Sequence, residues 1–186
     1  MDDPPPPRRW AARRGSLALG AVGVVAILAG AAFLLGTRSR EAEPGAGTAT
    51  PASGRHVYLL QPSAGTQSRV SLEVAADEAA RERGLSKRRE LPAGAGMAFL
   101  FPGDTEIAFW MKDTLVPLQI AFVRGDGRVV GLFEMAPCRA ERCPTYAPGR
   151  PYRYAVELSS GAFTAAGIRE GDRVVPQDPA TLPDPS

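Results

Sequence analysis

The side chains best suited to binding chemistry lie in one short run, Phe109-Trp110-Met111-Lys112-Asp113. This run combines an aromatic surface, an amine and a carboxylate where a predicted strand enters a turn, and strand ends of this kind often carry binding sites. A ligand with an apolar face and an anionic or hydroxylated end would suit it. We therefore take Trp110, Met111, Lys112 and Asp113 as candidate ligand-binding residues. The structural alternative assigns Phe109 and Met111 to the core, Trp110 to the outer face of a sheet, and the last two residues to a turn.

Carboxylates in strand-like runs offer a second kind of chemistry. Glu106, Glu134 and Glu157 each lie in such a run, and two carboxylates meeting in a cleft can act as general acid and base or cleave a glycosidic bond. The sequence does not bring them together, and most strand carboxylates are solvated or paired with arginine. Glu157 differs because it lies between Val156 and Leu158, so it must face either solvent or a specific partner. It is a further candidate site residue.

Other catalytic signatures are missing from the sequence. The only histidine is His56, ahead of the predicted domain, so no histidine is present to activate a serine or cysteine nucleophile. There is also no G-x-S-x-G elbow, no glycine-rich phosphate loop and no histidine-rich metal set. We therefore expect neither a cofactor nor a metal, and the sequence favours a non-enzymatic role.

The two cysteines, Cys138 and Cys143, lie between prolines in A-P-C-R-A-E-R-C-P. We predict a loop disulfide, and unpaired loop thiols are the alternative. A metal site would need two further ligands, and a redox motif of the usual kind has C-x-x-C spacing rather than C-x4-C. Closing so short a loop contributes only about 2 kcal/mol, so the bond would fix a loop rather than hold the fold.

Residues 16–36 contain no charged residue, and about 21 residues at roughly 1.5 Å each match a hydrocarbon core of about 30 Å. We predict one transmembrane helix there. Arg8, Arg9, Arg13 and Arg14 precede it, which favours a cytoplasmic N-terminus and an extracytoplasmic C-terminal domain. One alternative is a helix buried in a globular domain, and another is a cleaved signal peptide that releases a secreted domain.

Composition divides the rest of the chain. The formal net charge of +2 is spread along the chain, so nucleic acid is not an expected partner. The predicted organisation is a cytoplasmic tail at 1–15, the anchor at 16–36, a flexible linker at 37–56, a β domain at 57–175 and a Pro-rich tail at 176–186.

Alternation and turn signals predict a mainly β domain. Short helices are expected at 78–83 and from Ser159 to Ala166, and no repeated strand-helix-strand unit is evident. We expect a compact antiparallel sandwich or barrel, jelly-roll-like, with one or two short helices. The predicted strands are 69–75, 97–101, 106–111, 118–123, 128–134, 152–158 and 173–175.

The order of motifs over roughly residues 69–175 resembles one family, domain of unknown function 192. The resemblance implies a compact, mainly β fold and brings no established reaction. It rests on G-L at 84–85, G-M-A-F-L-F at 96–101, F-W-M-K-D-T-L-V-P-L at 109–118, I-A-F-V at 120–123, D-G-R-V-V at 126–130, the A-P-C…C-P-T-Y loop, Y-A-V-E-L-S-S-G at 154–161 and G-I-R-E-G-D at 167–172.

Two residues depart from the pattern of this family. The family commonly has Asn where this chain has Asp113, and Asp where it has Gln119. Gln119 keeps an acceptor oxygen but has no charge, so a metal-binding or general-base role at that position would be lost, whereas a turn hydrogen bond would survive. Gln119 is therefore also a candidate site residue.

Three functional hypotheses follow. The first is a membrane-tethered extracytoplasmic binding or accessory module of the cell envelope, which recognises an unknown envelope ligand or protein. The second is a carboxylate-dependent enzyme acting on an envelope polymer. The third is a structural domain that holds a partner through an exposed sheet edge or the cysteine loop.

Overall fold

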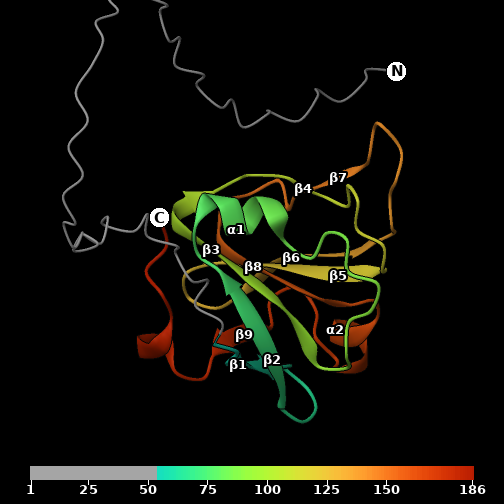
Figure 1. Ribbon diagram of the computed structural model, residues 1–186. Coiled ribbons are helices and arrows are strands. Elements are labelled where there is room, and N and C mark those ends of the chain that lie inside the picture. Colours follow the sequence, from blue (N-terminus) through green and yellow to red (C-terminus); the bar gives the residue numbers. More distant parts are fainter. Residues whose placement is uncertain (1–53) are drawn as a thin grey trace, which may run out of the picture. The chain divides into compact units, whose positions relative to one another are not determined.

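The fold is built around one curled sheet, seen in a computed structural model that describes residues 54–186 (Figure 1). Short alternating apolar runs form its strands, and the two helices are too short to form a layer of their own. The elements are β1 His56–Gln61, β2 Ser68–Ala75, α1 Glu78–Arg83, β3 Ala95–Thr105, β4 Phe109–Trp110, β5 Leu118–Val123, β6 Val129–Met135, β7 Thr145–Tyr146, β8 Tyr152–Ser159, α2 Ala162–Ala165, β9 Arg173–Pro176 and the 3-10 turn Pro179–Thr181.

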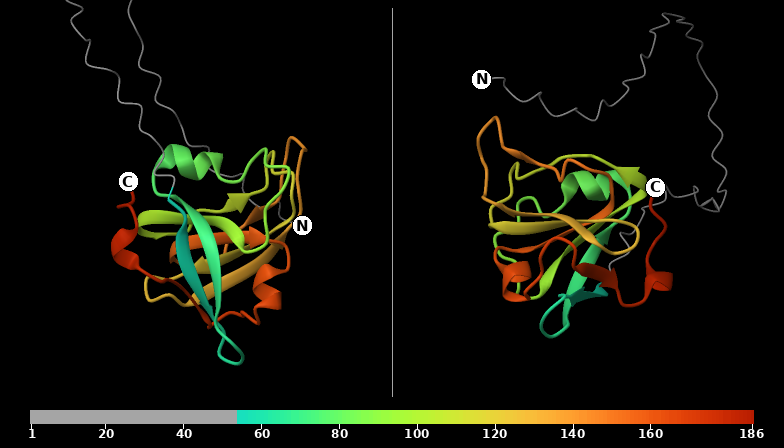
Figure 2. Two further views of the ribbon diagram at one scale, coloured as in Figure 1. Left: turned by 60° about the horizontal axis from the view of Figure 1, so that its bottom comes forward. Right: turned by 180° about the vertical axis from the view of Figure 1, so that it is seen from behind.

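Seven strands form the main sheet in the order β6-β5-β8-β3-β2-β1-β9. The sheet curls so far that the start of β6 meets β9: Val129 N–H donates to the Asp172 carbonyl, and Val174 N–H donates to the Gly127 carbonyl. Figure 2 shows the β1–β2 hairpin in blue-green, with its turn at the bottom of both views. The result is a half-barrel whose two edge strands touch at one end.

One strand pair runs counter to the expectation of an antiparallel fold. β2 and β3 are parallel, with Glu73 opposite Met97, because the chain returns through α1 and a loop before β3 begins. The mainly β class is confirmed, but the sheet is mixed. Its seven strands also form one curled layer rather than the two facing layers of a jelly roll.

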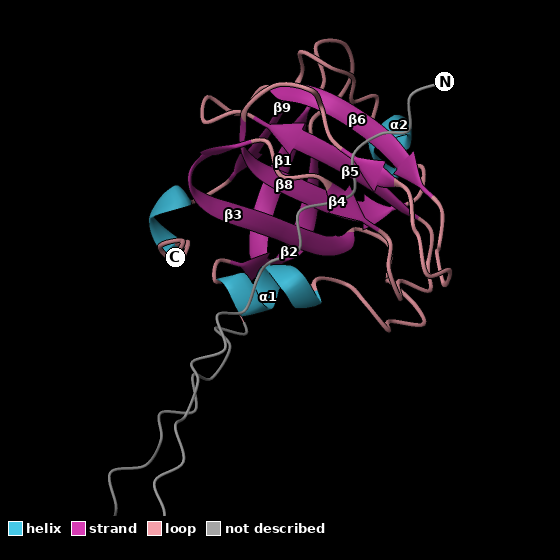
Figure 3. Ribbon diagram, turned by 90° about the horizontal axis from the view of Figure 1, so that it is seen from above, coloured by secondary structure: helices cyan, strands magenta, loops and turns pink. Residues whose placement is uncertain are grey.

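Each face of the sheet has its own apolar cluster. Inside the curl, Phe163 of α2 packs with residues of seven strands, such as Leu72 and Val156. On the outer face, Ala80 of α1 packs at the edge of a cluster that includes Phe99 and Phe122. Figure 3 separates the two helices, which lie on different sides of the strands.

A two-stranded sheet of β4 and β7 lies over the second cluster. The predicted strand 106–111 is shorter than expected, because only Phe109 and Trp110 pair, opposite Tyr146 and Thr145. Phe109 turns inward and its ring lies 5.0 Å from Phe99 and 5.6 Å from Phe122, centroid to centroid. This edge-to-face packing ties the small sheet to the large one.

The ends of the domain differ in detail from the sequence expectation. β1 begins at His56, inside the stretch predicted as linker, and inserts between β2 and β9 with Tyr58 and Leu60 buried. Beyond β9, the predicted Pro-rich tail lies against the domain, where Ser186 N–H donates to the Ala76 carbonyl. The predicted anchor at 16–36 lies outside the described residues. Within 54–186, no helix is long and apolar enough to cross a membrane.

Candidate functional site

Trp110 and Lys112 share the outer side of the small sheet. Alternation along the chain buries Phe109 partly and Met111 completely, while the Trp110 side chain remains 51% exposed. Thr145 lies opposite Trp110 on β7 and is also exposed. The predicted run therefore splits. Its inward residues are core, while Trp110 and Lys112 point outward and form, together with Thr145 of β7, the surface that we call the platform.

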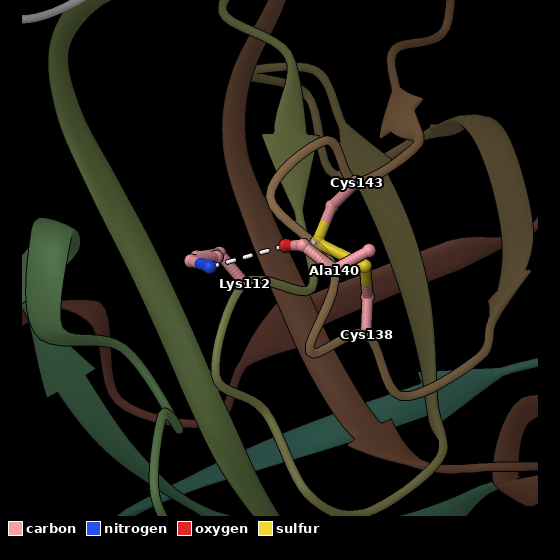
Figure 4. The surroundings of a disulfide bond; sticks show 4 residues. All are labelled: Lys112, Cys138, Ala140 and Cys143. Carbon is pink, nitrogen blue, oxygen red and sulfur yellow. Dashed lines mark hydrogen bonds between the residues drawn. A yellow bond between two sulfur atoms is a disulfide. The ribbon is translucent and has the colours of Figure 1, made fainter.

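The cysteine loop borders this platform. Cys138 and Cys143 form the predicted disulfide, and the Lys112 amine donates to the Ala140 carbonyl inside the closed loop at 3.1 Å (Figure 4). The backbone of Cys138 forms isolated β-bridges with Lys112 and with Thr114, and these bridges join the loop to the segment after β4. The disulfide thus fixes a loop next to the exposed indole, and the amine retains two donors for other acceptors.

Asp113 lies at a turn and makes its contacts through its backbone. Its φ of 57° is left-handed, its N–H donates to the Cys138 carbonyl, and its carbonyl accepts from Lys87 N–H. Asn is the side chain that tolerates this conformation best after glycine, and Asp tolerates it as well. The backbone geometry at this turn therefore suits Asn, which the family resemblance led us to expect here, and Asp113 satisfies the same requirement.

Gln119 uses both ends of its amide to hold α2. Its Oε1 accepts from Phe163 N–H at 2.8 Å and Thr164 N–H at 3.3 Å, and its Nε2 donates to Thr164 Oγ1 at 2.8 Å. The side chain is 3% exposed. The glycine at the N-cap of α2, Gly161, has no side chain for this task, so Gln119 supplies the missing acceptor from β5.

Glu157 lies on the outer face of β8, between Met97 of β3 and Ile120 of β5. It is 4% exposed, and burial raises the pKa of its carboxyl to about 8. Within residues 54–186, no hydrogen bond or ion pair to its carboxyl oxygens is found. The carboxyl is therefore protonated and neutral at pH 7, buried in a methionine- and aromatic-rich layer.

The three glutamates considered for acid–base catalysis are not brought together. Glu134 lies opposite Gln119 of β5, and Glu157 lies opposite Ile120 of the same strand. Because successive residues of a strand face opposite sides of the sheet, the two carboxyls lie on opposite faces. Glu134 accepts from Ser160 Oγ and Gly161 N–H, while Glu106 is exposed in the loop between β3 and β4. In the part of the chain that the structure describes, no group of three His, Cys, Asp or Glu residues is arranged to hold a metal ion.

Comparison with known families decides the classification. Residues 60–176 match the model of domain of unknown function 192 (DUF192), whose description is "Uncharacterized ACR". The chain belongs to the DUF192 family. The resemblance inferred from the motifs is confirmed, and the match includes the platform, Glu157 and all the strands except the first four residues of β1. No curated protein matches the sequence.

Two crystal structures share the DUF192-like fold of this chain. One, from Sinorhizobium meliloti 1021 and described as a proposed transcription regulator, is 28% identical, with a TM-score of 0.61 over 66% of this chain and 94% of the other. The second, a protein of unknown function from Novosphingobium aromaticivorans DSM 12444, is 29% identical, with a TM-score of 0.59 over 67% of this chain and 88% of the other. Both are covered almost completely by the β domain, so the domain is a recurrent unit.

Proposed function

We propose that this DUF192 protein is a membrane-tethered, extracytoplasmic binding module of the cell envelope. The observation that carries the proposal is the half-exposed indole of Trp110 on a platform fixed by core packing below and a disulfide-closed loop beside it. The uncharged segment 16–36 and the disulfide support the envelope location, because disulfides persist in oxidising compartments.

The platform suits a ligand with a flat apolar face and a polar edge. A large aromatic side chain contributes contact area without losing much side-chain entropy, and Trp is enriched among residues that dominate binding. Lys112 offers an amine to an anionic or hydroxyl group, and Thr145 offers a hydroxyl on the adjacent strand. A sugar ring of an envelope polymer has this combination of surfaces.

The other roles find less support. An acid–base enzyme would need two carboxylates in one cleft, and Glu134 and Glu157 face opposite sides of the sheet. A regulator that reads the major groove through a helix would need a longer one than α1 or α2, the two α-helices within the described range. A purely structural domain would hold a partner through an exposed sheet edge or through the cysteine loop beside the platform, and the polymer-binding experiment separates this role from the proposed one.

The test is co-sedimentation of the protein with insoluble envelope polymer, comparing W110A with a matched control. Val57 is the other large apolar residue exposed in the described range, 37% exposed on β1, so V57A removes apolar surface away from the platform. We expect W110A to weaken binding about tenfold or more and V57A to leave it within about twofold. Equal binding by W110A and the wild type would contradict the proposed site.

The envelope location is tested separately from ligand binding. Protease added to cells with a permeable outer layer and an intact inner membrane should digest the β domain if it lies outside the cytoplasm. Complete protection, with digestion only after lysis, would contradict the location while leaving the platform measurement interpretable.

A further inference from the structure

A hollow with three arginines at or beside it lies on another part of the domain, between the β5–β6 hairpin turn and β9. Arg173 lines the hollow, while Arg124 and Arg128 lie next to Asp126 at its edge. The hollow has a volume of about 420 Å³, within the range typical of small-molecule sites. Its lining includes Gln61, Asp126, Gly127, Arg173, Val175 and Pro179.

Two of the arginines are placed directly opposite each other. Arg128 and Arg173 form an antiparallel bridge where β6 meets β9, and like charges in opposed positions repel. Arg128 is partly engaged, since its Nη1 donates to the Gly171 carbonyl at 3.1 Å. Arg173 lines the hollow, and its Nη2 would lie at an ordinary contact distance of 3.5 Å from a Cβ added to Gly127. The same Cβ would lie only 2.4 Å from Val175 Cγ1, so the glycine leaves room for this apolar wall of the hollow.

The carboxylate of Asp126 lies near three arginine side chains at this turn. Asp126 Oδ2 lies 3.9 Å from Arg124 Nη2 and 4.0 Å from Arg128 Nε, and Arg173 also acts on its charge. Hydrogen bonding from Arg128 N–H, followed by these positive charges, lowers the pKa of Asp126. The carboxylate is thus ionised at pH 7, and within this set of three arginines and one aspartate the positive charges are in excess by two.

We propose that this hollow binds a phosphate monoester with a sugar- or polyol-sized body. A phosphate monoester carries a charge of about −1.5 to −2 at pH 7, which matches the excess, whereas a carboxylate would neutralise half of it. Arginine forks match phosphate oxygens well. The walls supply the amide of Gln61 for hydroxyl groups, and apolar contact from Val175 and Pro179.

The hollow reaches the end of β1 where the chain enters the domain. Pro176 of its lining pairs with Tyr58, and His56 Nδ1 lies 3.3 Å from Thr181 Oγ1, two residues after Pro179. A soluble phosphate ester and a phospholipid head group share the chemistry that the arginines recognise, and the experiment below separates these two sources.

The experiment is calorimetric titration of the full-length protein in a non-ionic detergent with glycerol 3-phosphate at low salt. We expect saturable binding with a dissociation constant of about 1 mM or tighter. R173Q should weaken it at least about tenfold, because it removes the arginine that faces the hollow. R89Q, which removes an exposed arginine in the loop after α1, is the matched control and should change binding less than about twofold.

The D126N variant should bind the ester more tightly, so this prediction does not depend on a loss of binding. It removes the competing charge but keeps an oxygen to accept from Arg128 N–H, so binding should tighten several-fold. Binding should also weaken on acidification from pH 7.5 to 5, because the second pKa of a phosphate monoester is about 6.

Three results of the titrations would overturn the proposal. These are absence of saturable binding at about 10 mM ester, equal weakening by R173Q and R89Q, or unchanged binding by D126N. Co-sedimentation with phosphatidylglycerol vesicles in the absence of ester binding would also overturn it and assign the arginines to a lipid surface. None of these outcomes depends on the Trp110 platform, so failure here leaves the proposed function standing.

Discussion

The buried carboxyl of Glu157 should make the domain less stable as the pH rises. In the folded protein its pKa is raised from 4.5 to about 8 by burial. Below pH 4.5 the carboxyl is protonated in both the folded and the unfolded chain, so it costs nothing. Between pH 4.5 and 8 only the unfolded chain ionises, which favours unfolding, and above pH 8 the loss is complete.

The magnitude follows from the same values. At about 1.4 kcal/mol per pH unit, the loss reaches about 3 kcal/mol at pH 7 and about 5 kcal/mol above pH 8. E157Q keeps the shape of the side chain but has no proton to lose. The variant should therefore match the wild type within about 1 kcal/mol at pH 4 and exceed its free energy of unfolding by about 3 kcal/mol at pH 7.

The assay is urea denaturation of residues 54–186, with the disulfide intact, at a series of pH values from 4 to 9. The difference between wild type and E157Q isolates this carboxyl, since the other titrating groups are common to both proteins. E106Q, which removes an exposed carboxylate, controls for the change in net charge. A difference that does not grow between pH 5 and 8 would refute the reasoning that Glu157 is buried and neutral.

Three further predictions concern residues with structural roles. Q119A should lower the free energy of unfolding by about 1–2 kcal/mol in urea denaturation, because two N–H groups of α2 lose their acceptor; Q119D, which keeps an acceptor, should lose less. D113A should cost about 1 kcal/mol in a thermal melt and D113N almost nothing, since only the alanine disfavours φ of 57°; equal losses would contradict this. Serine at both Cys138 and Cys143 should cost about 2 kcal/mol without loss of the far-ultraviolet circular dichroism spectrum, and a global loss of β signal would show that the loop holds the core.

Local patterns in the sequence predicted most of the sheet, because each pattern depends on neighbouring residues. The strand at 118–123 and the helix at 78–83 were predicted with their observed bounds. The order in which strands pair is not local. The parallel pairing of β2 with β3 depends on the path through α1, and nothing in the alternation of 69–75 distinguishes a parallel from an antiparallel neighbour.

The candidate site was predictable in part for the same reason. Alternation alone separates Trp110 and Lys112 from Met111, and two cysteines between prolines indicated the disulfide. The role of Gln119 as a cap for α2 was not predictable, because its partners Phe163 and Thr164 are distant in the sequence. The hollow near Arg173 was missed for the same reason.

The pairing of β1 with β9 has a consequence for how the chain is made. These two strands lie at opposite ends of the described sequence, yet they are neighbours in the sheet, and β9 also closes the curl against β6. During synthesis β1 emerges first and its outer edge has no partner until almost the last residues are available. The sheet therefore cannot be completed before β9 has been synthesised, and a truncation before Arg173 would leave an exposed strand edge prone to pairing with other molecules.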